Sequence, residues 1–228
     1  MGLLDKLKNL SSSKKGYKLL KQGKYEEAIK YLDNALELCP EDSVSWYNKG
    51  YGLDKLGKYK EALESYDKAL EINPNYADAW GNKGVTLENL EKHKEAIDCY
   101  NKALKLKPNN PKTWNNKGNS LRMLEKYDDA IKNYNEAIKL NPNYSKAWFF
   151  KGIAHGKLGE YTEEIKCFDK VLELEPMDEK VWYAKALVYL QLENPQNALN
   201  CLNKVLELNP NFEKALKYKK EALKLMEK

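Results

Sequence analysis

The feature that most limits how this chain can fold is a repeat of 34 residues. Prolines recur at that interval at Pro40, Pro74, Pro108, Pro142, Pro176 and Pro210. The chain's five tryptophans recur at the same interval, at Trp46, Trp80, Trp114, Trp148 and Trp182. Two residue types that keep one register over the chain predict an array of similar units, each of which contacts its neighbours in sequence.

Each period is predicted to form a hairpin of two helices. In the second period, apolar and small residues recur every three or four positions, as at Trp46, Gly50 and Leu53, which is the spacing of one helix face. The segment 57–59 (Gly-Lys-Tyr) separates the two helical patterns, and Pro74 ends the second one. Because one such hairpin cannot bury its apolar faces alone, successive hairpins are expected to stack.

The pattern W-x-x-x-G, then leucine, G-x-Y, alanine, Tyr or Phe, alanine and proline resembles the tetratricopeptide repeat, in a prokaryotic-type array. The resemblance implies an all-α fold, a right-handed α-solenoid of six helical hairpins closed by a C-terminal capping helix. It divides the chain into an N-terminal extension at 1–8, six repeats at 9–42, 43–76, 77–110, 111–144, 145–178 and 179–212, and the capping helix at 213–228. In that last helix, Ala215, Leu216, Ala222 and Leu223 are expected to cover the last hairpin.

The repeats depart from this pattern at a few positions, where the helix packing is expected to shift. Ser12 replaces tryptophan in the first repeat, Glu164 replaces an alanine in the fifth, and Ala186 replaces the glycine in the sixth. A lysine precedes that glycine position in every repeat, at Lys15, Lys49, Lys83, Lys117, Lys151 and Lys185. We interpret these lysines as packing side chains with flat stems and ammonium groups in water, rather than as a functional row.

The charge and the rare residues disfavour several function classes. The net charge is +5, but among 39 basic residues only Arg122 is an arginine. Proteins that read phosphates and guanine edges favour the planar guanidinium, so a nucleic-acid partner is not expected. The four cysteines form no C-x-x-C pair and only two histidines are present, so no metal and no cofactor are expected. No phosphate-binding glycine loop or nucleophile arrangement is found either, and the chain is not expected to be an enzyme.

The beginning of the sequence predicts the cellular compartment. The segment 1–13 lacks the apolar run and cleavage site of a secretory signal. No stretch reaches the ~18 consecutive apolar residues of a membrane span. We therefore expect a cytoplasmic protein with no membrane partner.

The resemblance further implies that the first helix of each hairpin lines a concave groove that binds other proteins or peptides. The positions that line the groove in the family correspond, in the N-terminal half, to Tyr17, Tyr47, Asn48, Tyr51, Asp78, Asn82 and Glu88. In the C-terminal half they correspond to Lys112, Asn115, Asn116, Asn119, Arg122, Lys146, Phe149, Phe150, Ile153, Lys157, Lys180, Tyr183 and Leu187.

Two features of these positions suggest a ligand. Asn48, Asn82 and Asn116 share one repeat position and resemble the asparagine row of the O-linked N-acetylglucosamine transferase repeats, which grips a peptide backbone. An amide both donates and accepts, so such a row suits an extended chain of any sequence. The alternative is that duplication of an ancestral repeat produced the row without a function.

The second feature is an aromatic and cationic cluster in the C-terminal half. Exposed Phe149, Phe150 and Tyr183 beside Lys146 and Lys180 would suit a partner that carries apolar and acidic residues. The alternative is that these aromatic residues pack between neighbouring first helices.

Two functions remain open. The first is a scaffold that binds an extended peptide segment of a partner in its groove. The second is a scaffold that assembles with itself through its ends or groove, in which the segment 1–9 could dock into a neighbouring copy. Leu3, Leu4, Leu7 and Leu10 fall on one helical face there, although this face could equally cover the first hairpin of its own chain.

Overall fold

The protein's structure is a computed structural model that describes residues 3–227, and the side chains of residues 8–227. Over that range the chain forms helices and no strand, as the sequence predicts. The first helices of the hairpins are α1 (Leu3–Lys21), α3 (Ser43–Lys55), α5 (Ala77–Asn89), α7 (Pro111–Met123), α9 (Ser145–Lys157) and α11 (Glu179–Gln191). The second helices are α2 (Tyr25–Leu38), α4 (Tyr59–Ile72), α6 (His93–Leu106), α8 (Tyr127–Leu140), α10 (Tyr161–Leu174) and α12 (Pro195–Leu208), and α13 (Glu213–Met226) follows them.

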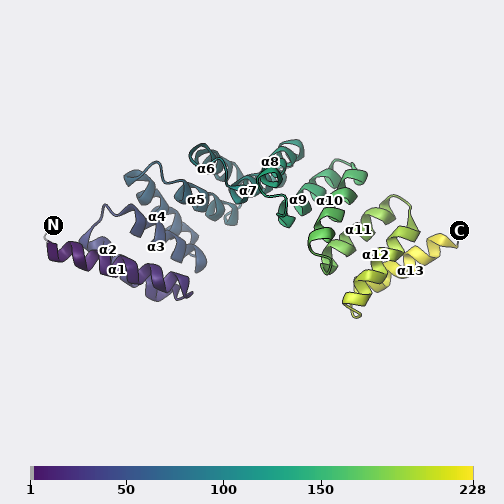
Figure 1. Cartoon of the computed structure of the whole chain (residues 1–228), viewed down its shortest axis with the longest axis horizontal. Helices are drawn as coiled ribbons and strands as arrows, with labels where there is room; N and C mark the ends of the chain where they lie inside the picture. Colours follow the sequence, from purple (N-terminus) through teal and green to yellow (C-terminus); the bar gives the residue numbers. More distant parts are fainter. Residues whose placement is uncertain (1–2, 228) are drawn as a thin grey trace. The chain divides into compact units, whose positions relative to one another are not determined.

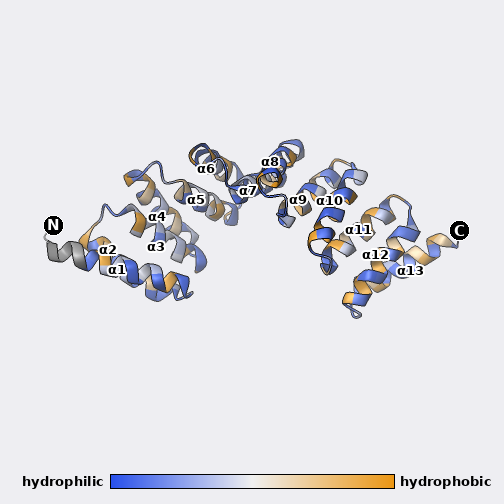
Figure 2. Ribbon diagram, viewed as in Figure 1, coloured by the Kyte–Doolittle hydropathy of each residue, from blue (hydrophilic) through white to orange (hydrophobic). Residues whose placement is uncertain are grey.

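The helices form two compact units. Unit 1 ends at Ser120, within α7, and unit 2 begins at Leu121. Within a unit, the two helices of a hairpin pack together and the second packs on the first helix of the next hairpin, as α1 to α6 do in Figure 1. Figure 2 shows that hydrophilic and hydrophobic residues alternate along the helices, as expected for helices with one face toward a neighbour and one toward water. The fold is therefore the all-α solenoid that the sequence predicts.

The first helix begins in the segment predicted as an extension. Residues 3–8 continue without a break into α1, which has 19 residues where α3 has 13. Of the apolar face predicted there, Leu10 is exposed. The side chains of Leu3, Leu4 and Leu7 lie outside the described residues.

The tryptophans and prolines share one register because they are hydrogen-bonded to each other. In each of the five turns that lead into a tryptophan-bearing helix, the tryptophan Nε1 donates to the carbonyl oxygen of the proline six residues earlier, at 2.7 to 2.9 Å. The proline ends the preceding helix, since its ring cannot continue one. The bond therefore fixes how the chain passes from one hairpin to the next.

The glycine of the pattern makes room for a large side chain on the second helix. A Cβ at Gly50 would lie 2.8 Å from the ring of Tyr66, and one at Gly84 would lie 2.5 Å from that of Tyr100. The sixth repeat has Ala186 at this position, and the residue 16 positions later is Leu202, which is smaller than tyrosine. A leucine alone does not make room for a Cβ, because a Cβ at Gly16 in the first repeat would lie 2.7 Å from Leu32.

Of the lysines before this position, Lys15 is exposed and the other five are half-buried. Several are paired, so their ammonium groups do not simply lie in water. Lys49 Nζ lies 2.6 Å from Asp33 Oδ1 and 5.2 Å from the ring centre of Trp46. Lys83 and Lys185 pair in the same way with Asp67 and Asp169. These lysines join the second helix of one hairpin to the first helix of the next. They therefore have a structural role, as predicted, but their ammonium groups are paired with carboxylates.

Hydrogen bonds between side chains also join successive first helices in unit 1. Thr86 Oγ1 donates to Asp54 Oδ1 at 2.6 Å, and Ser120 Oγ donates to Glu88 Oε1 at 2.7 Å. The two donors, Thr86 and Ser120, are 34 residues apart, and so are the two acceptors, Asp54 and Glu88. In unit 2, alanine and valine occupy the donor positions, at Ala154 and Val188. The first helices of unit 1 are therefore held by polar contacts that unit 2 replaces with apolar packing.

Glu164 departs from the repeat pattern and is buried in unit 2. It takes the place of an alanine on α10, and its carboxylate fills the space that Gly156 leaves, because a Cβ at Gly156 would collide with it. Burial raises the pKa of Glu164 to about 7, since the low-dielectric interior disfavours its charged form. Unit 2 thus accommodates the carboxyl group more readily when it is protonated.

The capping helix covers the last hairpin with fewer residues than predicted. Ala215 and Ala222 are fully buried against α12, in a cluster with Cys201 and Leu202. Leu216 and Leu223, predicted to join them, are 43% and 42% exposed. The helix presents its narrow alanine stripe to the core, so the leucines are directed outward.

Within the described residues, no helix has the length and apolar character that crossing a bilayer requires.

The link between tryptophan and proline is testable by Trp80→Phe. The variant loses the hydrogen bond to the Pro74 carbonyl and keeps an aromatic ring, so we expect the free energy of unfolding to fall by about 1 kcal/mol. Urea unfolding followed by circular dichroism measures this change. An unchanged midpoint would contradict the structural role of the bond.

The burial of Glu164 predicts a pH dependence of stability. The unfolded carboxyl ionises near pH 4.5 and the folded one near pH 7, so between these values the folded state binds more protons and its stability falls as pH rises. We expect Glu164→Gln to abolish this slope and to raise the unfolding free energy above pH 7 by about 1 to 3 kcal/mol. Parallel slopes for the two proteins in urea titrations from pH 4 to 8 would contradict the assignment.

Candidate functional site

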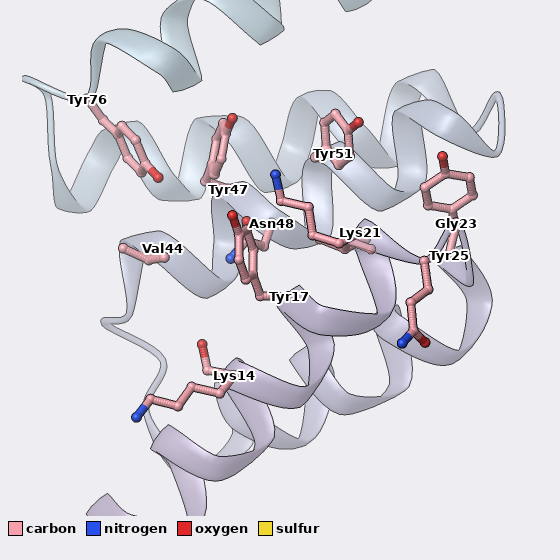
Figure 3. Close-up of a pocket in the computed structure, with 13 residues that line it drawn as sticks. Lys14, Tyr17, Lys21, Gly23, Tyr25, Val44, Tyr47, Asn48, Tyr51 and Tyr76 are labelled. Carbon is pink, nitrogen blue, oxygen red and sulfur yellow. The ribbon is translucent and has the colours of Figure 1, made fainter.

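A pocket of about 960 Å³ opens in unit 1 among α1, α2 and α3 (Figure 3). Five tyrosines line it: Tyr17 on α1, Tyr25 at the start of α2, Tyr47 and Tyr51 on α3, and Tyr76 just before α5. The other lining residues are Ser13, Lys14, Leu20, Lys21, Gln22, Gly23, Val44 and Asn48. No carboxylate stands among the lining residues in the described part of the chain, so the pocket combines aromatic walls with hydrogen-bond donors.

The helical repeat places these tyrosines on one surface. Tyr47 and Tyr51 are four residues apart on α3, so they lie on the same helix face. Tyr17 occupies on α1 the repeat position that Tyr51 occupies on α3. Figure 3 shows Tyr76, Tyr47 and Tyr51 in a row, with Tyr17 rising from α1 toward Tyr47. Stacking of adjacent repeats therefore gathers rings that are distant in sequence.

Tyr47 is held in place at the centre of this surface. Asn82 Nδ2 donates to its hydroxyl at 3.0 Å, and its ring centre lies 4.8 Å from that of Tyr76. Burial raises the pKa of Tyr47 to about 12. The hydroxyl thus stays protonated at neutral pH and keeps its own hydrogen to donate to a ligand.

A second, smaller pocket of about 190 Å³ continues from the first and shares Tyr47 with it. It lies along α5 and the start of α7, where Asn82, Lys112 and Asn116 reach it. Its other lining residues are Ala77, Asp78, Gly81, Val85, Asn110 and Thr113. We call the two adjoining pockets the unit 1 groove.

The three asparagines of the predicted row all line the unit 1 groove, Asn48 in the larger pocket and the other two in the smaller one. They differ in access: Asn48 is only 5% exposed, whereas Asn82 and Asn116 are half-buried. Asn115, also predicted to face a ligand, is buried, and its amide lies 3.5 Å from Asn116 Oδ1. The structure therefore leaves Asn82 and Asn116 as the accessible members of the row.

The predicted aromatic cluster of unit 2 is not exposed. Phe149 packs against Phe168 and Phe150, with ring centres 5.7 and 5.4 Å apart. Tyr183 packs against Phe212, at 5.0 Å. All three predicted residues are half-buried, because they fill the space between neighbouring helices. The expectation of exposed rings was wrong, because the rings are half-buried. The alternative predicted packing between neighbouring first helices, but the ring partners Phe168 and Phe212 lie on α10 and just before α13.

The other predicted residues lie as follows. Arg122 places its guanidinium carbon 5.3 Å from the ring centre of Phe150, and Ile153 packs in the same apolar cluster as Phe149. Asn119 is half-buried on α7, whereas Lys146 and Lys180 are exposed at the starts of α9 and α11. These residues do not line the unit 1 groove, and their role in binding stays a prediction.

Several groove residues were missed by the sequence reasoning. Tyr25, at the start of α2, was predicted only as the tyrosine of the G-x-Y pattern, and Tyr76, just before α5, was not predicted. Lys14 and Lys21 lie on α1, whose repeat has a serine where the others have tryptophan. The signal that could have found them is the density of tyrosine around the first two repeats, where Tyr17, Tyr25, Tyr47 and Tyr51 all occur.

A family profile described as "Tetratricopeptide repeat" matches residues 13–42, 43–76, 77–110, 111–144 and 179–212, and a second profile of the same description matches 145–177. No curated protein gives a significant match.

Several solved structures are similar to this chain. "Crystal structure of YrrB: a TPR protein with an unusual peptide-binding site" describes a protein 30% identical to it, with a TM-score of 0.71 over 83% of this chain and 97% of the other. The MamA protein is 22% identical, with a TM-score of 0.71 over 77% of this chain and 96% of MamA. PilF of Pseudomonas aeruginosa is 19% identical, with a TM-score of 0.79 over 95% and 99%. The last two similarities concern the fold alone.

Proposed function

The chain belongs to the tetratricopeptide repeat family, and from this premise we propose that it is a scaffold whose unit 1 groove binds an extended peptide segment of a partner protein. The observation that carries the proposal is the pair of adjoining pockets on α1, α3, α5 and α7, which share Tyr47. A continuous surface of this kind accommodates a chain of several residues, rather than one compact small molecule.

The polar groups of the groove suit a peptide backbone. Asn82 donates an amide hydrogen to the Tyr47 hydroxyl, and its carbonyl oxygen can accept from a peptide N–H. Asn116 lines the groove one repeat further along. Amides at successive repeats can pair with peptide groups two or three residues apart along an extended chain, as the asparagine row of the transferase repeats, which this row resembles, grips a peptide backbone. The peptide-binding site reported for YrrB supports the same kind of ligand for this chain.

The proposed role is non-catalytic. The groove offers aromatic rings, amides, hydroxyls and lysines, which bind and orient a ligand. Binding energy from such a surface comes from a few buried anchors surrounded by weaker polar contacts.

We expect Asn82→Ala combined with Asn116→Ala to weaken peptide binding at least tenfold. The probe is a set of dodecamers selected on the intact chain from a randomised displayed library and then titrated by calorimetry. Each lost amide leaves a backbone group of the peptide without its partner, which costs about 1 kcal/mol or more.

The matched control is Asn101→Ala with Asn135→Ala, which removes two exposed asparagines at equivalent positions of the second helices α6 and α8. Thermal unfolding of both variants checks that the fold is intact. If the groove variant and the control bind the selected peptides equally well, the asparagine row has no part in binding.

Self-assembly is the second candidate function, and the outer face of α13 favours it. Leu216 and Leu223, seven residues apart and therefore on one side of the helix, are both more than two-fifths exposed. Sedimentation velocity over a hundredfold range of concentration tests it. Self-assembly predicts a concentration-dependent dimer that Leu216→Glu with Leu223→Glu abolishes, whereas a monomer throughout would exclude it.

A further inference from the structure

We propose that the unit 1 groove selects proline-rich segments in the polyproline II conformation. This inference rests on the proposed function and names the class of peptide that the groove would take. It derives from two parallel rows of side chains on the first helices, one aromatic or apolar and one donating hydrogen bonds.

The apolar row consists of Tyr17, Tyr51 and Val85, which share one repeat position on α1, α3 and α5. All three line the groove, the tyrosines in the larger pocket and the valine in the smaller one. Tyr17 is 49% exposed, so its ring is available to a ligand. Flat proline rings dock between aromatic ridges of this kind in other proline-binding modules.

The donor row lies three residues earlier on the same helices. It consists of Lys14, Asn48, Asn82 and Asn116, which also share one repeat position and all line the groove. Positions i and i+3 are neighbours on a helix, so the two rows run side by side. The first and third repeats therefore pair an apolar contact with an accessible donor, Lys14 and Asn82, whereas Asn48 in the second repeat is only 5% exposed.

This pairing matches what a proline-rich chain lacks. Proline has no N–H, and the polyproline II helix forms no internal hydrogen bonds, so its carbonyl oxygens need donors from outside. The larger pocket supplies tyrosine hydroxyls, the ammonium groups of Lys14 and Lys21 and the amide of Gln22, and no carboxylate among its described lining residues competes as an acceptor. A groove rich in donors and aromatic rings favours a ligand with acceptors and apolar rings.

The spacing of the helices also favours this conformation. The first helices α1, α3 and α5 contact each other in sequence, and packed helices lie about 8 to 10 Å apart. One turn of polyproline II, three residues, advances about 9 Å. Every third residue of such a peptide would meet the next repeat in register, whereas the two-residue repeat of a β-strand advances about 6.6 Å and falls out of step.

The test is a titration of the intact chain with acetylated decaproline, compared with a Gly-Ser repeat and a Thr-Gln repeat of equal length. We expect decaproline to bind at least tenfold more tightly than either. Tyr17→Ala should weaken its binding at least fivefold, and Tyr17→Phe, which keeps the ring, should retain most of the affinity. Tyr127→Ala, which removes a tyrosine from the start of α8 in unit 2, should have no effect.

The outcomes separate this inference from the function on which it rests. If decaproline binds no better than the other two repeats while library-selected peptides still depend on Asn82 and Asn116, the proline preference is wrong and groove binding stands. If Tyr17→Ala binds decaproline as tightly as the intact chain does, the proposal that proline binds at Tyr17 in the larger pocket is also wrong. If neither decaproline nor any selected peptide binds, both proposals fail.

Discussion

The hydrogen bond from each tryptophan indole to the carbonyl of the proline six residues earlier is the interaction on which the rest of the structure depends. It occurs at five turns with nearly the same length, 2.7 to 2.9 Å. The proline ends one helix and the indole fixes where the next begins, so each hairpin meets its neighbour in a similar way. Side chains at one repeat position therefore form rows along the first helices. The candidate groove consists of such rows.

The two units use the same repeat for different contacts. In unit 1, polar bonds such as Thr86 to Asp54 hold the first helices, and the residues beside them line the groove. In unit 2, Phe149 and Phe150 on α9 pack against Phe168 and Tyr134 on second helices, and Glu164 is buried on α10. Phe149, Phe150 and Tyr183 are half-buried there and pack against other rings. The proposals for binding consequently concern unit 1.

Much of the fold could be predicted from the sequence, because the 34-residue register specifies both the hairpin and its stacking. The asparagine row could be predicted for the same reason, since it follows from the register alone. Exposure could not. Whether Phe150 faces solvent depends on Tyr134, 6.4 Å away on another helix, and whether Leu216 is buried depends on which stripe of α13 meets α12. Tyr25 and Tyr76 were missed because they lie outside the first helices, and only the stacked structure shows that they line the larger pocket.

The most direct test of the central claim is amide hydrogen exchange of the intact chain with and without a saturating library-selected peptide. Binding in the unit 1 groove predicts slower exchange in α1, α3 and α5, where Tyr17, Tyr47 and Asn82 lie. The second helices α4 and α6, which turn away from the groove, should change little, as should α9 to α13. Protection confined to unit 2 or to the second helices would show that the peptide binds elsewhere and would contradict the account.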